Sequence, residues 1–137
     1  MKENISKHLS YNEATHSNTA KSRKIDNTPD ADTIVRMKFV AENCFEPLRE
    51  WYGKPIKINS FYRSPKLNVA IGGAKKSQHL KGEAIDISVG SREENKKLFD
   101  WLAENVEFDQ LINEYDYKWI HISRKINNNR NMKFNII

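Results

Sequence analysis

The segment Ser77–Ile87, which reads SQHLKGEAIDI, decides how the sheet of this protein must be arranged. After its glycine, Ile85 and Ile87 alternate with Asp86. Successive side chains of a strand point to opposite faces, so the two isoleucines share one face and Asp86 lies on the other. The pattern predicts a strand over 84–89 with its apolar face in the core and its other face open.

A second strand, predicted over 118–123, repeats this arrangement because isoleucines alternate there with Trp119 and His121. If the two strands are neighbours, Asp86 and His121 converge on one surface. His79 precedes a glycine that turns the chain back, and it can reach the same point. The sequence thus predicts a cluster of two imidazoles and one carboxylate.

This set of side chains suits Zn²⁺ in an open catalytic site, where a water molecule takes the fourth position. The geometry fits a hydrolase. Other interpretations stay open, because a single histidine on a strand is usually a packed or hydrogen-bonded core residue and an aspartate near a glycine usually forms a turn. Spacing alone therefore indicates a metal site without deciding for it.

The remaining elements place this cluster in an α+β fold. An apolar stripe at helical spacing predicts a helix over 30–53 that kinks or restarts at Pro47. Further predicted elements are a strand over 55–62, a short helix over 64–71, a helix from Ser91 to Val106 opened by a capping box, a strand over 108–114 and a last edge strand over Met132–Ile137. Helices cluster early and strands late, without βαβ alternation. We therefore expect a small, mainly antiparallel sheet with helices packed on one face.

The chain of 137 residues has the length of one domain. Residues 1–29 are polar and are expected to form an arm with at most one short helix near 11–14, packed on the domain. Residues 30–137 are expected to form the main domain, so that the whole chain is one folded unit.

Charge and apolar content narrow the possible partners. The chain has 23 Lys and Arg against 18 Asp and Glu, a net charge of +5, which favours an anionic partner such as nucleic acid, a membrane surface or a bacterial cell wall. The basic residues occur in ones and twos, without the basic stripe of a nucleic-acid reader, so we expect no nucleic-acid partner. No apolar run reaches the roughly 18 residues that span a bilayer, and the start, Met1–Ser6, has no signal-peptide pattern. We expect no membrane insertion and synthesis without a signal peptide.

The single cysteine, Cys44, excludes an internal disulfide framework and a thiolate-rich zinc site. It lies on the apolar stripe of the predicted helix over 30–53. We therefore interpret it as a small core residue and not as a catalytic thiol.

The motif Ser77-x-His79-x-x-Gly82-x-Ala84-x-Asp86, followed by Trp119-x-His121, resembles the zinc D-alanyl-D-alanine carboxypeptidases and L-alanyl-D-glutamate endopeptidases of bacteria and their phages. Their fold is shared with hedgehog signalling domains. Strings at 48–50, 59–65, 67–68 and 71–74 also resemble that family, in the same order, so the resemblance covers about residues 6–123. One departure is Phe61, where relatives often have glycine, and it affects packing before chemistry.

The resemblance implies a role for each matching residue. His79, Asp86 and His121 would be the ligands of one zinc ion. Glu114 would be the general base, with the nearby Asp116 as the alternative. The resemblance further implies that Arg63 contacts the substrate and stabilises the oxyanion, that Ser77 and Gln78 contact the substrate or support the site, and that Trp119 forms a wall of the groove, with core packing as its alternative.

The resemblance also implies the function. The chain would hydrolyse an amide bond in peptidoglycan stem peptides, as a D,D-carboxypeptidase or an L-Ala–D-Glu endopeptidase, in phage lysis or cell-wall degradation. It would act as a monomer at the cell wall after release, or be carried in a phage particle. The alternative from another class is a zinc-stabilised binding or structural module with a hedgehog-like fold and no catalysis.

Overall fold

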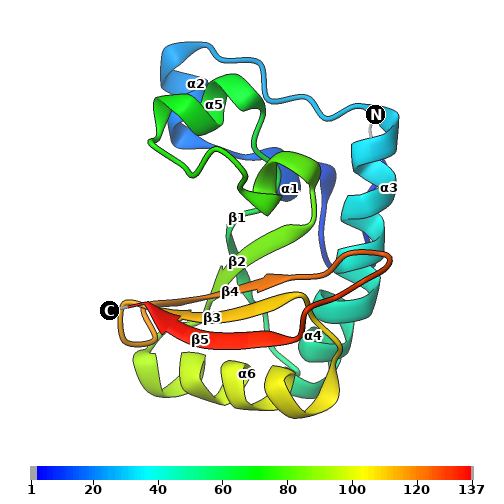
Figure 1. Ribbon diagram of the computed structural model, residues 1–137, viewed down its shortest axis with the longest axis vertical. Coiled ribbons are helices and arrows are strands. Elements are labelled where there is room, and N and C mark those ends of the chain that lie inside the picture. The colour runs from blue at the N-terminus through cyan, green and yellow to red at the C-terminus, as the bar shows by residue number, and fades with distance from the viewer. Residues whose placement is uncertain (1–2, 137) are drawn as a thin grey trace.

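Five strands form one mixed sheet in the computed structural model, which describes residues 3–136 (Figure 1). Their order is β1-β2-β4-β3-β5. The strands are β1 (Lys57–Ser60), β2 (Ala84–Ser88), β3 (Gln110–Glu114), β4 (Trp119–Ser123) and β5 (Met132–Ile136). β1 with β2, β2 with β4 and β4 with β3 pair antiparallel, so the predicted mainly antiparallel sheet and the α+β class are confirmed.

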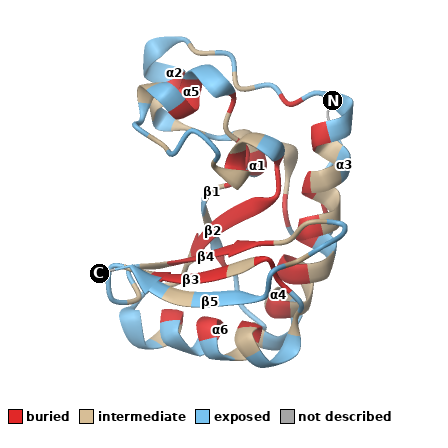
Figure 2. Ribbon diagram, in the orientation of Figure 1, coloured by how far each residue is buried: buried red, intermediate tan, exposed pale blue. Residues whose placement is uncertain are grey.

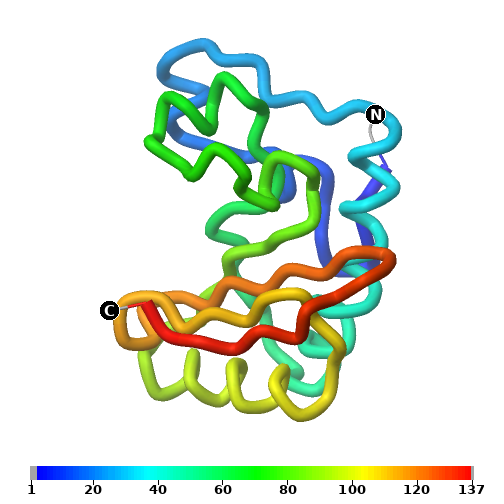
Figure 3. The backbone as a smooth tube through the Cα atoms, in the orientation of Figure 1, coloured from blue at the N-terminus to red at the C-terminus, as the bar shows by residue number. Residues whose placement is uncertain are grey.

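The last strand differs from the other strands in direction, because β5 pairs parallel to β3. The chain leaves β4, turns through residues 124–131 and returns on the far side of β3 (Figure 3). A return after β4 runs opposite to β4, and since β3 is also antiparallel to β4, β5 must run parallel to β3. Ile137, the expected end of this strand, lies outside the described residues.

Helices α3 (Ala31–Val40), α4 (Glu46–Tyr52) and α6 (Arg92–Asn105) cover the core side of the sheet (Figure 1). Between α3 and α4 the chain forms one π-helical turn, Ala41–Phe45, in which the Glu46 N–H donates to the Ala41 carbonyl. Pro47 lacks an N–H and is tolerated in the first turn of α4. The predicted interruption of the helix at Pro47 therefore takes the form of a π turn.

The core lies between these helices and the apolar face of the sheet (Figure 2). Its members from β2, β3 and β4 are Ile85, Ile87, Leu111, Ile120 and Ile122, and those from the helices include Met37, Val40, Cys44, Leu48, Leu98 and Leu102. The alternation of apolar residues along β2 and β4 thus has the predicted direction. Among the described residues no helix has the length and apolar character needed to cross a membrane.

The N-terminal residues contain two short helices, α1 (Tyr11–Thr15) and α2 (Asn18–Arg23). The expectation of at most one helix was wrong, because the Ser17 side chain accepts a hydrogen bond from the Ala20 N–H and caps a second helix. Ile5 and Leu9 join the core. Nδ1 of His8 lies 2.7 Å from Oε1 of Glu46. The division of the chain at residue 30 stays a prediction.

Two short elements lead into β2. They are α5 (Pro65–Ala70), capped by Ser64, and the 3₁₀ helix η2 (Gln78–Lys81). Gly82 ends η2 with φ 71°. A Cβ at this position would lie 2.5 Å from Cγ of Met37 and 3.1 Å from the Thr33 carbonyl oxygen, so only glycine fits. This turn places His79 beside the start of β2.

Candidate active site

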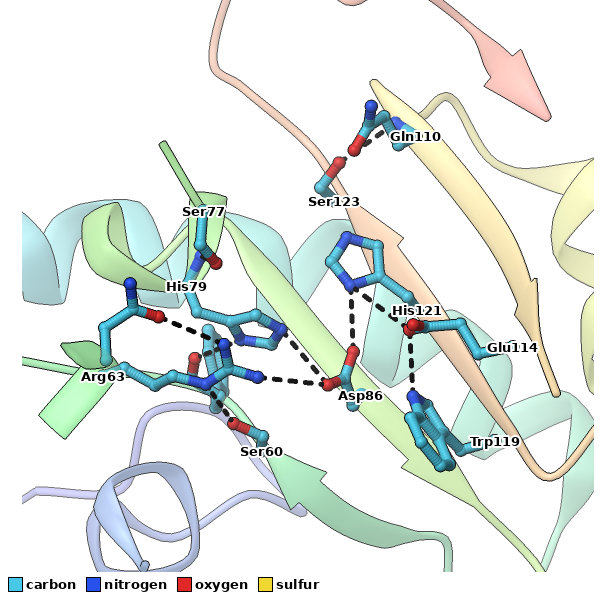
Figure 4. A network of polar contacts seen from close by, with 12 residues as sticks. Ser60, Arg63, Ser77, His79, Asp86, Gln110, Glu114, Trp119, His121 and Ser123 are labelled. Carbon is cyan, nitrogen blue, oxygen red and sulfur yellow. Dashed lines mark hydrogen bonds and ion pairs between the residues drawn. The ribbon is translucent and has the colours of Figure 1, made fainter. Parts of the chain in front are cut away.

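Asp86 and His121 are direct partners across β2 and β4. Oδ1 of Asp86 lies 2.9 Å from Nδ1 of His121. Both side chains leave the sheet on the face opposite the core (Figure 4). The expectation that these residues converge if their strands are neighbours is confirmed.

His79 reaches the same point from η2. Its Nδ1 lies 2.6 Å from the Phe61 carbonyl oxygen, and because a carbonyl only accepts, Nδ1 carries the hydrogen and Nε2 keeps a lone pair. Nε2 lies 3.2 Å from Oδ2 of Asp86. It is buried and has no hydrogen-bond partner among the described residues. Two acceptor atoms that face each other in this way indicate the place of a cation.

The donor set fits zinc. His79, Asp86 and His121 each offer one ligand atom, and these atoms lie within 4.8 Å of one another. Burial disfavours the charged form of the Asp86 carboxyl, but the two histidines outweigh this effect and lower its pKa, so it is anionic. Two imidazoles and one carboxylate leave one position of a tetrahedral zinc open. All three residues line a pocket of about 410 Å³.

Glu114 lies at the end of β3, directly opposite Trp119 of β4. Its Oε2 accepts a hydrogen bond of 2.9 Å from Nε1 of Trp119 and lies 4.0 Å from Nδ1 of His121. Burial first, and the nearby Asp86 carboxylate second, raise the pKa of Glu114. A carboxylate in this position, with a raised pKa, can exchange protons with a substrate in the pocket.

Asp116, the alternative base, lies in the turn between β3 and β4. The three turn residues 115–117 have φ between 53° and 60°. The Asp116 side chain is 86% exposed, and its nearest charged partner is Arg92, at 3.9 Å. The geometry therefore favours Glu114.

Arg63 lies largely buried beside Asp86 and is not an ordinary surface arginine. Its side chain is only 16% exposed, and its Nη2 lies 3.7 Å from Oδ2 of Asp86. Its Nε donates to Oγ of Ser60 at 3.2 Å (Figure 4). Its Nη1 donates to Oδ1 of Asn68 at 3.3 Å. These contacts hold a cation beside the metal ligands.

The family described as Peptidase M15 matches residues 7–123. The chain belongs to the peptidase M15 family. This family is zinc-dependent and acts on peptide substrates, so the chain is a metallopeptidase by descent. The matched range includes His79, Asp86, Glu114 and His121 and ends with β4. A comparison with curated proteins finds no match.

In this M15 peptidase, Ser77, Gln78 and Trp119 all line the pocket. Oγ of Ser77 accepts from the backbone N–H of His79 at 3.2 Å and so caps η2. Gln78 reaches the buried Asp109 instead of the metal ligands. Trp119 is half-buried on the open face of β4, next to Tyr115, and does not lie in the main core.

Several residues in or behind the M15 pocket escaped sequence reasoning. Asn68 holds Arg63 and is almost fully buried. A Cβ on Gly73 would lie 2.1 Å from Oδ1 of Asn68, so glycine is required there. Both positions belong to strings that carried the family resemblance, which was the available signal. Arg130 also lines the pocket, although it lies beyond the matched residues and no sequence pattern indicates it.

Proposed function

We propose that this M15 peptidase hydrolyses an amide bond in the peptide stems of peptidoglycan, in phage lysis or cell-wall degradation. The observation that carries the proposal is the convergence of His79, Asp86 and His121 at one pocket that Glu114 and Arg63 also line. The net charge of +5 supports an anionic polymer as the partner. The bond is either the D-Ala–D-Ala terminus or the L-Ala–D-Glu linkage, and the enzyme works as a monomer.

Zinc would be held by Nε2 of His79, a carboxylate oxygen of Asp86 and Nδ1 of His121. When bound in such a site, zinc polarises the scissile carbonyl and lowers the pKa of a water molecule. The Phe61 carbonyl fixes the tautomer of His79 that leaves Nε2 free to bind. The protein thus supplies two imidazoles and one carboxylate, all oriented before the substrate arrives.

Glu114 handles the proton. Its carboxylate lies just outside the three ligands, where it accepts a proton from the attacking water and returns it to the leaving amine. Trp119 keeps one carboxylate oxygen in place through its indole N–H, so the group has a defined orientation. Its raised pKa favours the second step, in which the protonated carboxyl acts as an acid.

Arg63 stabilises negative charge on the carbonyl oxygen as the tetrahedral intermediate forms. Ser60 and Asn68 fix two of its donor groups, which keeps the guanidinium plane in one orientation. A preoriented cation in a partly dry pocket needs little reorganisation during the reaction.

Digestion of purified peptidoglycan tests the proposal, with mass measurement of the released fragments. Loss of a terminal alanine identifies a D,D-carboxypeptidase, and release of peptides that begin with D-glutamate, with L-alanine left on the glycan, identifies the endopeptidase. The zinc-depleted protein and Glu114→Gln serve as inactive controls. Stoichiometric zinc binding without any fragment would instead support the non-catalytic, zinc-stabilised module.

A further inference from the structure

Arg130 lies at the pocket although it comes from the segment that follows β4. Its Nη2 donates to Oδ2 of Asp109 at 2.6 Å, and its Nε donates to Oδ1 at 3.1 Å. Asp109 is completely buried directly before β3. Two parallel donor contacts to one carboxylate give the guanidinium a fixed plane at the pocket.

The backbone around Arg130 is fixed as well. The Arg130 N–H donates to Oδ1 of Asp109 at 2.8 Å, and the Met132 N–H donates to the Asp109 carbonyl at 2.9 Å. Asn128 and Asn131 have φ of 62° and 55°, a conformation that asparagine tolerates better than most residues. The Asn-rich segment, residues 127–131, is therefore an ordered turn that carries Arg130. Its hydrogen bonds to Asp109, directly before β3, fix the position of the Arg130 backbone.

Two cations lie against the Asp109 carboxylate. The single negative charge of Asp109 faces both Arg130 and Lys125, whose Nζ lies 3.6 Å from Oδ1. Burial opposes ionisation of Asp109, but the hydrogen bonds from Arg130 outweigh it and lower the pKa of the carboxyl to about 2. A second carboxylate, Glu83, lies near Lys125 and Asp109. The guanidinium of Arg130, which lines the pocket, is therefore the cation left for an incoming group.

Gln78 also contacts Asp109, at the same carboxylate oxygen that Nη2 of Arg130 contacts. Its Nε2 donates to Oδ2 of Asp109 at 3.0 Å. Its Oε1 is buried and has no hydrogen-bond partner among residues 3–136. Gln78 lines the pocket together with Arg130, and this oxygen is an unpartnered acceptor on a side chain that shares Oδ2 of Asp109 with Arg130. A hydrogen-bond acceptor near a cation can bind a ligand in which a peptide N–H neighbours a carboxylate, with the N–H at the acceptor and the carboxylate at the cation.

We propose that Arg130 and Gln78 form a subsite that binds a free carboxylate and the neighbouring amide N–H of the stem peptide. Asp109 is the positioning residue that holds both side chains. This proposal rests on the proposed function and adds a preference for substrates with a free carboxylate next to the cleaved bond. The charged member of the subsite, Arg130, lies outside the part of the chain that matches the family, whereas Gln78 and Asp109 lie inside it.

Two synthetic stem peptides test the subsite. They differ only in the carboxylate nearest the cleaved bond, which is free in one and a primary amide in the other. The native enzyme should prefer the free carboxylate. In Arg130→Gln the ratio of the two kcat/KM values should fall about tenfold, because one charge-assisted contact is lost. Arg130→Lys should keep part of the preference, since it retains the charge but not the planar fork.

The control variant is Lys133→Gln, which removes one positive charge from the exposed edge strand β5. Its ratio should equal that of the native enzyme. Calorimetric binding of both peptides to Glu114→Gln, with and without Arg130→Gln, gives a second readout that does not depend on turnover. There the added Arg130→Gln change should weaken binding of the free-carboxylate peptide about tenfold more than binding of the amide.

Several results would overturn the subsite. Native cleavage of both peptides with equal kcat/KM, or an equal loss for both in Arg130→Gln, would show that Arg130 only ties the C-terminal segment to β3. Proposed function and subsite fail together only if the native zinc-loaded enzyme cleaves neither peptide and releases nothing from peptidoglycan. Activity of the native enzyme on peptidoglycan thus shows whether only the subsite fails or the proposed function fails as well.

Discussion

Asp86 and His121 occupy directly opposite positions on β2 and β4, with Oδ1 and Nδ1 2.9 Å apart. Opposite residues of an antiparallel pair have their Cβ atoms about 4.5–5.5 Å apart, so strand pairing alone brings these ligand atoms together. His79 is the only one of the three that depends on a turn, because it arrives through η2 and Gly82. The candidate metal centre is thus positioned by a sheet register and one glycine.

Removal of one ligand should abolish stoichiometric zinc binding. His121→Ala leaves two donors, and the loss of affinity should exceed the roughly 10- to 100-fold cost of losing an outer-shell partner. The exposed His16 provides the matched variant His16→Ala, which should keep one zinc per chain. Elemental analysis after gel filtration makes the comparison. Undiminished zinc in His121→Ala would contradict the assignment.

Glu114→Gln should retain zinc and the thermal midpoint but lose about 10²- to 10⁴-fold in turnover. The amide can still accept the hydrogen bond from Trp119, so the side chain stays in place while its basicity is lost. Asp116→Asn is the control and should remain active, because that carboxylate is 86% exposed in the turn. The reverse pattern would identify Asp116 as the base.

Arg63→Lys should impair catalysis more than stability. Lysine keeps a positive charge beside Asp86 but cannot donate to Ser60 and Asn68 while also meeting an oxyanion. Turnover should fall at least about tenfold, with a stability change near or below about 1 kcal/mol. Turnover and thermal midpoint are measured on the same sample. Native turnover, or a collapsed midpoint with loss of zinc, would assign Arg63 a purely structural role.

Gly73→Ala should lower both turnover and stability while zinc stays bound. The new Cβ would lie 2.1 Å from Oδ1 of Asn68 and 3.2 Å from Nη1 of Arg63, so both side chains must move. Overpacking of this kind costs about 1–3 kcal/mol. Gly90→Ala is the matched control, since its Cβ would meet nothing within 4 Å. Equal kinetics and unfolding curves for the two variants would refute the proposed contact.

Cys44 should be inert in the folded protein. It is fully buried, and burial raises the pKa of its thiol to about 12. At pH 8 the thiol is therefore protonated as well as shielded, and Ellman's reagent should label it only after denaturation in guanidinium. Rapid stoichiometric labelling of the native protein would show that the helical segment around Cys44 readily exposes its buried face to solvent.

The sequence alone was sufficient to predict which side chains of β2 and β4 face the core and which face the pocket. Alternation along β2 and β4 follows from the local geometry of an extended chain, so the isoleucines and the ligands Asp86 and His121 could be assigned to opposite faces without any tertiary contact. Alternation along β3 assigned Glu114 and Ile112 to the same face and so could not show which of them has a polar role. Both line the pocket, because the wall of a groove contains apolar as well as polar side chains. The family resemblance supplied the roles that periodicity could not.

Only the tertiary structure decided which distant residues meet the site. The parallel direction of β5, the buried position of Arg63 and the pairing of Arg130 with Asp109 depend on how loops return to the sheet. Such contacts join residues that no local period relates, and their stability comes from burial and charge pairing in the completed fold. From the sequence alone, Arg130 is therefore predicted only to lie in a loop. It becomes part of the pocket because β5 pairs with β3.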